Sequence, residues 1–141
     1  MKIAFGCDHA ALELKGNLIK FVENMGHSTK DFGTYNNERV NYPDYAKVVS
    51  AAVAKGEYDL AILVCGSGIG MSIVANKTRG VRAVVCSEPY SAKLSREHNN
   101  TNVLCIGARV VGLDLAEMIV KAWLEASFEG GRHAERVALF E

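Results

Sequence analysis

The chain has 141 residues, and its 16 basic and 16 acidic side chains give a formal net charge of zero. That length suits one domain, and the balanced charge argues against binding to nucleic acid or to a membrane surface through a basic face. The longest apolar run, Leu60–Cys65, is far too short to cross a bilayer.

The first half of the chain alternates apolar strands with amphipathic helices. Lys2–Gly6 is predicted to be a strand. The apolar stripe over 14–25 has i, i+3/i+4 spacing and predicts a helix that ends at Gly26. His27–Phe32 alternates more weakly, which is typical of a strand near a sheet edge. After a polar loop, the spacing over 45–53 predicts a second helix.

The second half continues the same alternation. The unbroken hydrophobicity of Leu60–Cys65 indicates a strand with helices on both faces, as in a parallel sheet. The elements predicted after it are, in order, a helix over 71–77, a strand over 82–86, a helix over 87–97, a strand over 103–107 and a helix over 113–126. These repeated β-α units predict one α/β domain over residues 1–141, a three-layer αβα Rossmann-like sandwich with a five-stranded parallel sheet. The pair Gly130-Gly131 separates a short terminal segment, 132–141, from the last helix.

The cysteines indicate a reducing compartment. Cys7, Cys65, Cys86 and Cys105 each lie in or at the end of an apolar run, and none has the C-x-x-C spacing of zinc or thioredoxin-like sites. Buried reduced thiols therefore fit better than a disulfide framework. The chain runs directly into its first strand without room for a signal peptide, so we expect a cytoplasmic protein.

Two unusual loops are predicted to lie side by side. Open parallel sheets bind ligands beyond the carboxyl ends of their strands, where the strand order reverses. If the order is 2-1-3-4-5, this crevice lies between the first and third strands. The loops there are Cys7-Asp8-His9 and the glycine-rich segment Cys65–Gly70.

The glycine-rich loop has the composition of an anion-binding turn. It places the Cys65 thiol at a strand end, and glycines follow that let the backbone approach a ligand. Free N–H groups at a helix start favour an anion or a developing oxyanion, and such a position stabilises a thiolate. The alternative interpretation is a tight turn with a small buried cysteine. The loop lacks the Lys of a Walker A motif, and it follows the third strand rather than the first, where a Rossmann fingerprint belongs.

Other polar residues have a structural and a functional interpretation. Asp8 could simply cap a helix, and a lone His9 is more often structural. The cluster that begins with His98-Asn99 could mark a helix C-terminus. However, this cluster precedes the fifth strand, at the opposite pole of the sheet from Cys65. If His98 acts with Cys65, it must come from a second chain, which predicts a site shared across a homodimer.

Three arginines could bind a phosphate. Arg109 follows the fifth strand, and Arg132 and Arg136 are spaced i, i+4, so both point one way if this segment is helical. Isolated surface arginines are usually only solvated. The functional interpretation is that the three arginines converge on one phosphate, because guanidinium groups bind phosphate oxygens in a bidentate manner.

Together these motifs resemble one family. The segments that carry the resemblance cover nearly the whole chain in the same order, and they are Gly6-Cys7-Asp8-His9, Val64–Gly70, Ser95–Asn99, Gly107–Gly112 and Glu129–His133. They resemble the type B ribose-5-phosphate isomerases, a family that includes allose-6-phosphate isomerases and galactose-6-phosphate isomerase subunits. Asn41 departs from the family, in which Asp is common, and so does Ser67, where many relatives carry Thr.

The resemblance implies an isomerase of the pentose phosphate pathway that needs no cofactor and no metal. It implies Cys65 as the base that moves a proton between C1 and C2, and His98 as the acid that assists ring opening, with Ser67 keeping its hydroxyl beside them. The enediolate oxygen would be held by the amides of Gly66, Ser67, Gly68, Ile69 and Gly70. Contacts to the sugar or its phosphate would come from Asp8, His9, Asn99, Arg109, Arg132 and Arg136. The resemblance also implies a dimer or tetramer with sites shared between subunits.

Several alternatives stay open. The preferred substrate could be allose 6-phosphate or galactose 6-phosphate rather than ribose 5-phosphate. A phosphocysteine carrier of a sugar phosphotransferase system would place its cysteine after the first strand of a shorter chain. A cysteine-dependent phosphatase would need an arginine six residues after Cys65, where this chain has Met71. A sugar-phosphate sensor on the same fold is the remaining alternative.

Overall fold

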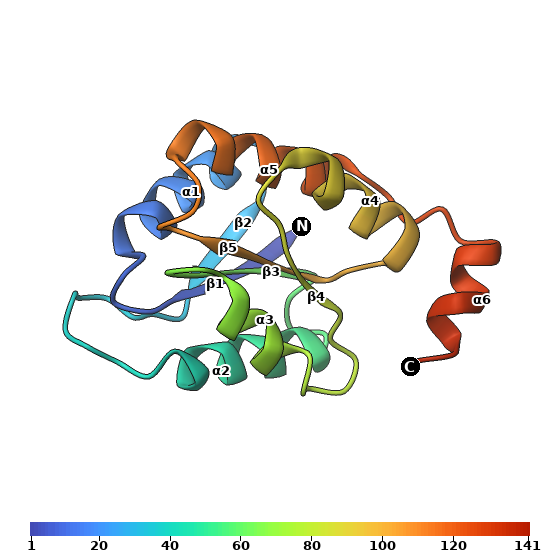
Figure 1. The fold of residues 1–141 in the computed structure, drawn as a ribbon, viewed down its shortest axis with the longest axis horizontal. Coiled ribbons are helices and arrows are strands. Elements are labelled where there is room, and N and C mark those ends of the chain that lie inside the picture. Colours follow the sequence, from blue (N-terminus) through green and yellow to red (C-terminus); the bar gives the residue numbers. More distant parts are fainter.

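The computed structural model describes all residues, 1–141, as a three-layer α/β sandwich (Figure 1). Its five strands form one parallel sheet and are β1 (Lys2–Cys7), β2 (Ser28–Asp31), β3 (Leu60–Cys65), β4 (Ala83–Val85) and β5 (Val103–Gly107). Its six helices are α1 (Leu12–Asn24), α2 (Tyr42–Ala54), α3 (Ile69–Ala75), α4 (Pro89–Asn99), α5 (Leu113–Glu125) and α6 (Arg132–Ala138). The fold class predicted from the sequence is confirmed.

The strand order differs from the order 2-1-3-4-5 assumed above. The sheet runs β2-β1-β3-β5-β4, so β5 inserts between β3 and β4 and pairs Cys65 with Gly107. Burial explains the difference, because every residue of β5 is buried, whereas the three residues of β4 are half-buried or exposed. The short, partly exposed strand takes the edge and the fully apolar strand takes the interior. The loop after β5 therefore lies beside the loop after β3.

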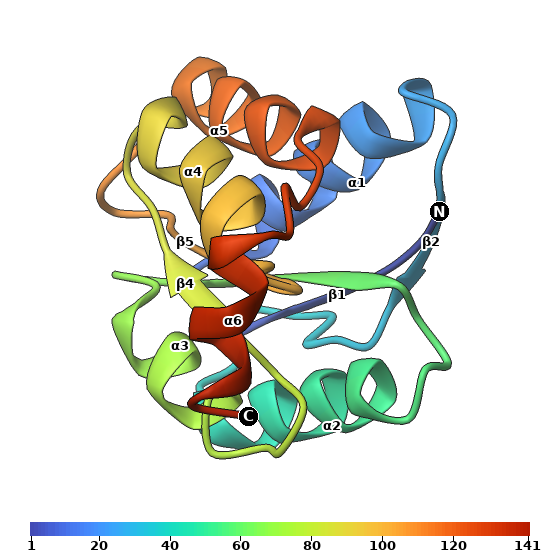
Figure 2. The same cartoon turned by 90° about the vertical axis from the view of Figure 1, so that its right-hand side faces the viewer.

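Helices cover both faces of the sheet. Figures 1 and 2 show α1, α4 and α5 on one side and α2 and α3 on the other. Alternate residues of the central strands divide between two hydrophobic clusters, so that Phe5 and Ile62 face the first layer and Leu63 and Cys65 face the second. Coverage on both faces accounts for the unbroken apolar run of β3.

The terminal segment forms a short helix at the amino ends of the strands. α4 begins where the Glu88 carboxylate accepts a hydrogen bond from the Ser91 N–H, and it ends at Asn100, which adopts a left-handed conformation with φ 50°. Gly130 and Gly131 also have positive φ angles and turn the chain into α6. Figure 2 shows α6 crossing in front of this edge of the sheet, and it packs against α4.

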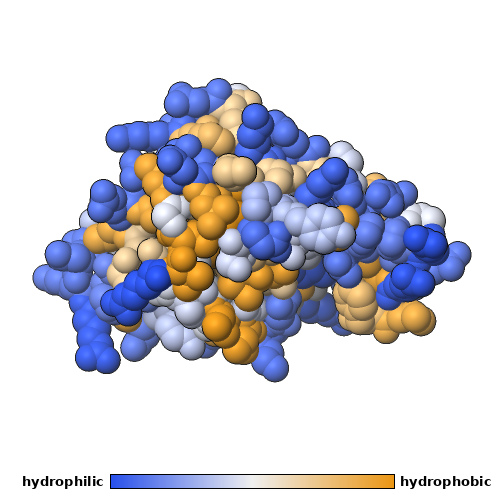
Figure 3. Space-filling model, turned by 45° about the horizontal axis from the view of Figure 1, so that its top comes forward, coloured by the Kyte–Doolittle hydropathy of each residue, from blue (hydrophilic) through white to orange (hydrophobic).

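On the face that Figure 3 shows, hydrophobic side chains gather in the central part and hydrophilic side chains surround them. Among the helices, none combines the length and the apolar character that a membrane crossing requires. All four cysteines are buried free thiols, as the sequence predicts.

Candidate active site

A cleft of about 660 Å³ opens at the carboxyl ends of β1, β3 and β5. Each of these strands contributes a loop to it: Asp8 follows β1, the segment 65–70 ends β3 and begins α3, and Arg109 follows β5. Its lining residues are Asp8, Tyr42, Cys65, Gly66, Ser67, Ile69, Gly70, Ile73, Arg109 and Val110. The two loops expected to be neighbours from the sequence therefore meet in one cleft.

Cys65 is the last residue of β3 and lies in the wall of this cleft. Its Sγ accepts a hydrogen bond from the Gly68 N–H at 3.1 Å, and 5% of the residue is exposed. Gly68 is buried within the loop and has a φ of +79°, which favours glycine. The N–H groups of Gly66 and Ser67 have no hydrogen-bond acceptor within the chain. The loop thus offers a sulfur atom and free amide donors side by side.

The glycine-rich loop is fixed against β5. The N–H groups of Ala108 and Arg109 donate to the carbonyl oxygens of Cys65 (2.8 Å) and Gly66 (3.0 Å). A Cβ atom at Gly107 would lie 2.7 Å from the Ser67 backbone, so only glycine permits this approach. The Arg109 side chain lies over Gly66, with Nη1 3.5 Å from the position that a Cβ would occupy there. The insertion of β5 beside β3 is what brings Arg109 into the cleft.

A second pocket of about 510 Å³ adjoins the cleft and shares Asp8 and Tyr42 with it. His9 lines this second pocket, and its Nδ1 accepts a hydrogen bond from the Val40 N–H at 3.2 Å. The Asp8 carboxylate accepts from the Ala10 N–H at 3.0 Å. Asp8 does not cap α1, because the N-cap residue is Ala11 and no side chain caps this helix; the Asp8 carboxylate instead closes a short turn before the helix and lines both pockets.

Tyr42, Ile73 and Val110 line the cleft although the sequence analysis did not identify them, and Tyr42 is the polar one among them. It begins α2 and lies against Gly70, where a Cβ atom would come within 2.6 Å of the tyrosine ring. The loop before α2 therefore reaches across to the glycine-rich loop. A glycine at position 70 was the only sequence signal of this contact, and it does not identify the partner.

The remaining predicted site residues lie at the other end of the molecule. β3 and β5 are parallel, so His98, which precedes β5, is near the amino end of the sheet, and Cys65 is at its carboxyl end. The length of β3 alone separates these two ends by roughly 16 Å. Arg132 and Arg136 are exposed on α6, at the same end as His98. One chain therefore does not bring these residues to Cys65.

Asn99 also lies away from the cleft. It lines a pocket of about 370 Å³ that includes Arg82 and Phe140. The His98 ring stacks on His133, with ring centroids 4.2 Å apart. The opposite-pole placement that the topology predicts is confirmed.

Comparison with known proteins agrees with this architecture. Residues 3–140 match the family described as Ribose/Galactose Isomerase. The chain belongs to this family. The ribose-5-phosphate isomerase B of Escherichia coli K12 is 60% identical over 136 residues, which are 96% of this chain and 91% of that protein.

Other members of the isomerase family extend the comparison. A galactose-6-phosphate isomerase subunit LacB from Clostridium acetobutylicum is 35% identical, covering 97% of this chain and 79% of that protein. The solved structure of ribose-5-phosphate isomerase B from Clostridium thermocellum matches with a TM-score of 0.97 at 52% identity, over 99% of this chain and 94% of that one. The chain is thus an aldose–ketose isomerase.

Among the four thiols of this isomerase, Cys65 alone lines the cleft. Burial raises the pKa of the Cys86 thiol to about 11, with a smaller contribution from the Glu88 carboxylate. Burial also raises the pKa of Cys105, and it raises that of Cys7 although Lys15 partly offsets the effect. These three thiols are therefore held in the protonated form at neutral pH and are unsuited to act as bases.

Proposed function

We propose that this isomerase interconverts ribose 5-phosphate and ribulose 5-phosphate through an enediolate. The observation that carries the proposal is the position of Cys65, whose sulfur accepts an amide hydrogen bond in the wall of a cleft that Asp8 and Arg109 also line. The activity named for the E. coli relative supports the choice of substrate. The proposed unit is the whole chain, residues 1–141, acting in the cytoplasm.

The Cys65 thiolate is the proposed base. It removes the proton from C2 of the open-chain aldose and returns it to C1, while a proton moves from the C2 hydroxyl to the C1 oxygen. The hydrogen bond from the Gly68 N–H stabilises the sulfur anion before it takes the C2 proton and after it returns that proton to C1; between the two steps the sulfur is a neutral thiol. The sugar ends as the ketose and the thiolate is regenerated, so each turnover is balanced without a redox partner or cofactor.

Charge that develops on the sugar oxygen needs donors that are already in place. The unpaired N–H groups of Gly66 and Ser67 lie next to the thiol and suit this task. Removing one such donor typically costs about 10²–10³ in rate. The Arg109 guanidinium lies over Gly66 and adds positive charge to the same side of the cleft. The remaining amides of the loop and the Ser67 hydroxyl complete the proposed set.

Ring opening requires an acid, and we assign it to His98 of a second copy. Within one chain His98 is at the opposite end of the sheet, so a dimer is the arrangement that joins it to Cys65. His98 would donate a proton to the ring oxygen as the bond from that oxygen to C1 breaks, and the C1 hydroxyl would lose its proton to water as the C1 carbonyl forms. Asn99, Arg132 and Arg136 would enter with it and bind the sugar and its phosphate.

The rim of the cleft supports such an association. Its exposed hydrophobic side chains are Ile69 (54% exposed), Ile73 (56%) and Val110 (59%), with Val85 (39%) close to the Gly68 turn. Covering them removes apolar surface from water at about 25 cal/mol per Å². A second copy seated here closes the cleft and contributes the missing imidazole.

The relative named as a galactose-6-phosphate isomerase subunit favours a second candidate substrate class, the aldohexose 6-phosphates. These substrates are one hydroxymethylene longer than ribose 5-phosphate. The pocket beside His9 adjoins the cleft and gives room for a longer chain. Allose 6-phosphate and galactose 6-phosphate therefore belong in any substrate panel.

The test is a panel of ribose 5-phosphate, allose 6-phosphate and galactose 6-phosphate with wild-type protein, Cys65→Ser and the matched control Cys86→Ala. We expect the highest kcat/KM with ribose 5-phosphate. Cys65→Ser should lose at least about 10²-fold in kcat but still bind substrate, and Cys86→Ala should keep its activity. Undiminished turnover by Cys65→Ser would remove the proposed base.

Solvent deuterium distinguishes proton transfer on the sugar from phosphate transfer to Cys65. Incorporation at C1 or C2 of the sugar in D₂O supports proton transfer. Phosphate transfer to Cys65 without deuterium incorporation would favour the phosphocysteine carrier instead.

A further inference from the structure

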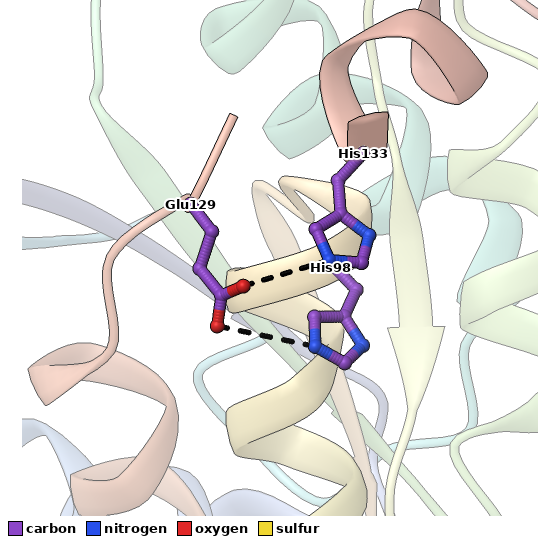
Figure 4. A group of neighbouring side chains, drawn as sticks. All are labelled: His98, Glu129 and His133. Atoms are coloured by element: carbon purple, nitrogen blue, oxygen red, sulfur yellow. Dashed lines mark ion pairs between the residues drawn. The ribbon is translucent and has the colours of Figure 1, made fainter. Parts of the chain in front are cut away.

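Three potential metal ligands converge at the amino end of the sheet, although they come from separate parts of the chain. His98 is next to last in α4, Glu129 lies in the link between α5 and α6, and His133 is in the first turn of α6. Figure 4 shows both imidazoles directed towards the one carboxylate. One ligand atom from each residue can be chosen so that all three lie within 4.8 Å of one another.

The gaps within this cluster are too long for good hydrogen bonds. Nε2 of His98 is 4.0 Å from one Glu129 oxygen, and Nε2 of His133 is 3.5 Å from the other. Charge-assisted N–H···O bonds are about 2.7–2.9 Å long. Around a tetrahedral Zn²⁺ with bonds of about 2.0–2.2 Å, neighbouring donor atoms lie about 3.3–3.6 Å apart. An inward adjustment of about 1 Å would bring the three atoms onto one ion.

The backbone holds the three residues in place before any ion arrives. The Glu129 N–H donates to the carbonyl oxygen of Glu97 at 3.0 Å, which ties the link to the end of α4. The His133 N–H donates to the Gly130 carbonyl oxygen at 3.0 Å and fixes the first turn of α6. The two rings are nearly parallel, with 8° between their planes, so both present an edge to the carboxylate.

We propose that His98, Glu129 and His133 bind a divalent ion of the Zn²⁺ class. Two imidazole nitrogens and one carboxylate oxygen suit Zn²⁺ and its neighbours, whereas Mg²⁺ and Ca²⁺ prefer oxygen ligands. The His98 and Glu129 side chains are 38% and 52% exposed, so a fourth position is open to solvent. Neither imidazole makes another hydrogen bond within the chain, so no neighbour orients the rings for a metal ion. Arg132 also adds positive charge next to His133. We therefore expect the site to bind the ion reversibly rather than hold it as a structural centre.

Occupation of this site inhibits the isomerase, and this second part rests on the proposed function. A bound ion takes the Nε2 lone pair of His98, the group proposed as the acid for ring opening. Sugar phosphate turnover and metal binding at this site are therefore mutually exclusive.

The direct test is calorimetric titration of the metal-free full-length protein with ZnCl₂ in a non-chelating buffer. We expect one Zn²⁺ per chain, and at least about tenfold weaker binding to Glu129→Gln and to His133→Gln. The matched control is Glu135→Gln, which removes the same charge from α6 outside the cluster and should bind as the wild type does. Unweakened binding by both cluster variants, or no binding by the wild type, would overturn the site.

Cys65 could also bind Zn²⁺, so binding at this thiol must be distinguished from binding at His98, Glu129 and His133. Cys65→Ser should bind Zn²⁺ as tightly as the wild type, and the Co²⁺-loaded protein should show no thiolate-to-metal charge-transfer band. Loss of binding in Cys65→Ser would assign the ion to the cleft and overturn the proposal.

Inhibition is measured separately from binding. Zn²⁺ should inhibit the wild type but spare Glu129→Gln, whose activity without metal should be close to that of the wild type. Inhibition of both proteins to the same extent would overturn the inhibitory role. Lack of turnover by the metal-free wild type would instead refute the proposed function. The calorimetric evidence for or against the metal site would not be affected.

Discussion

At the scale of single residues, the four thiols occupy unequal environments. All four belong to the two hydrophobic clusters, but only Cys65 also lines the cleft. The thiolate is the form that alkylating reagents attack. Burial raises the pKa of Cys86 to about 11 from an ordinary value of 9.0, which lowers its thiolate population at pH 8 about a hundredfold.

We therefore predict selective alkylation of Cys65. Native protein treated with iodoacetamide at pH 8 and analysed by peptide mass mapping should carry label on Cys65 well before Cys7, Cys86 or Cys105. The sign of the effect follows from the raised pKa values: labelling of Cys86 should increase as the pH approaches 11. Protein unfolded in urea should label at all four positions, and equal labelling of the four in the native protein would contradict the prediction.

Gly70 is a second residue whose environment makes a prediction. It has an ordinary φ, so alanine is permitted by the backbone, but the new Cβ would lie 2.6 Å from the Tyr42 ring. Gly70→Ala should displace Tyr42, destabilise the fold by about 1–3 kcal/mol and lower kcat/KM for the sugar phosphate. Urea unfolding and steady-state kinetics measure the two effects.

The control for Gly70→Ala is Gly16→Ala, because a Cβ at Gly16 meets nothing within 4 Å and alanine favours the helix. It should leave the kinetics unchanged. The double variant Gly70→Ala/Tyr42→Ala removes the clashing ring and should recover stability relative to the sum of the single changes. Strict additivity of the two changes would show that Tyr42 is not the obstacle.

At the scale of elements, local patterns were sufficient where burial is complete. The predicted bounds of β3 and β5 match the structure, because both strands are apolar throughout. β4 is shorter than expected, and its place at the edge was not predicted, because strand order depends on contacts between distant segments. α3 begins at Ile69, two residues earlier than expected, since Gly68 already makes the turn.

The site shows the same division between local and distant information. The loops after β1 and β3 were expected to meet, because a strand reversal places them together. Arg109 joins them only through the position of β5, and Tyr42 only through the path of the loop before α2. Neither of these contacts leaves a periodic pattern in the sequence.

Contact between α1 and the segment after β2 depends on a buried ion pair. The ammonium of Lys15, whose side chain is 3% exposed, donates to Asp31 at 2.7 Å and to the Thr34 carbonyl oxygen at 2.6 Å. The Asp31 side chain is 33% exposed and also accepts from the Gly33 N–H. Removing either partner leaves the other unpaired. The Lys15 ammonium would then be a buried charge without water, whereas the Asp31 carboxylate is partly exposed to solvent.

We predict that Asp31→Ala destabilises the protein by about 3–5 kcal/mol, because it leaves the buried Lys15 ammonium without a carboxylate partner. Lys15→Met should cost only about 1–2 kcal/mol, since the Asp31 carboxylate can regain water. The free energies of unfolding in urea test this order. Lys93→Met, which breaks an exposed pair with Glu97 at 3.7 Å, should change stability by less than about 0.5 kcal/mol. A larger loss in Lys15→Met than in Asp31→Ala would contradict the argument.

At the scale of the whole molecule, the two halves of the proposed chemistry lie at opposite ends of one sheet. The thiol and the amide donors lie at the carboxyl end of β3, whereas His98, Arg132 and Arg136 belong to the end of α4 and to α6, at the amino end. Figure 1 shows the end of α4 and α6 at the side of the sheet opposite the start of α3. In a dimer with a two-fold axis, the thiol end of one copy meets the imidazole end of the other, and two equivalent sites form. A substitution of Cys65 or of His98 in both copies therefore inactivates both sites.

This arrangement predicts complementation between two inactive variants. In a mixed dimer of Cys65→Ser with His98→Asn, one site carries both lesions and the other carries neither. Random assembly of equal amounts makes half of the dimers mixed, so about a quarter of wild-type activity should return. Co-refolding the two variants and assaying ribose 5-phosphate turnover measures this value. Mixing Cys65→Ser with the double variant Cys65→Ser/His98→Asn restores no intact site and should stay inactive. If the first mixture stays as inactive as its parents, His98 and Cys65 do not act across two chains.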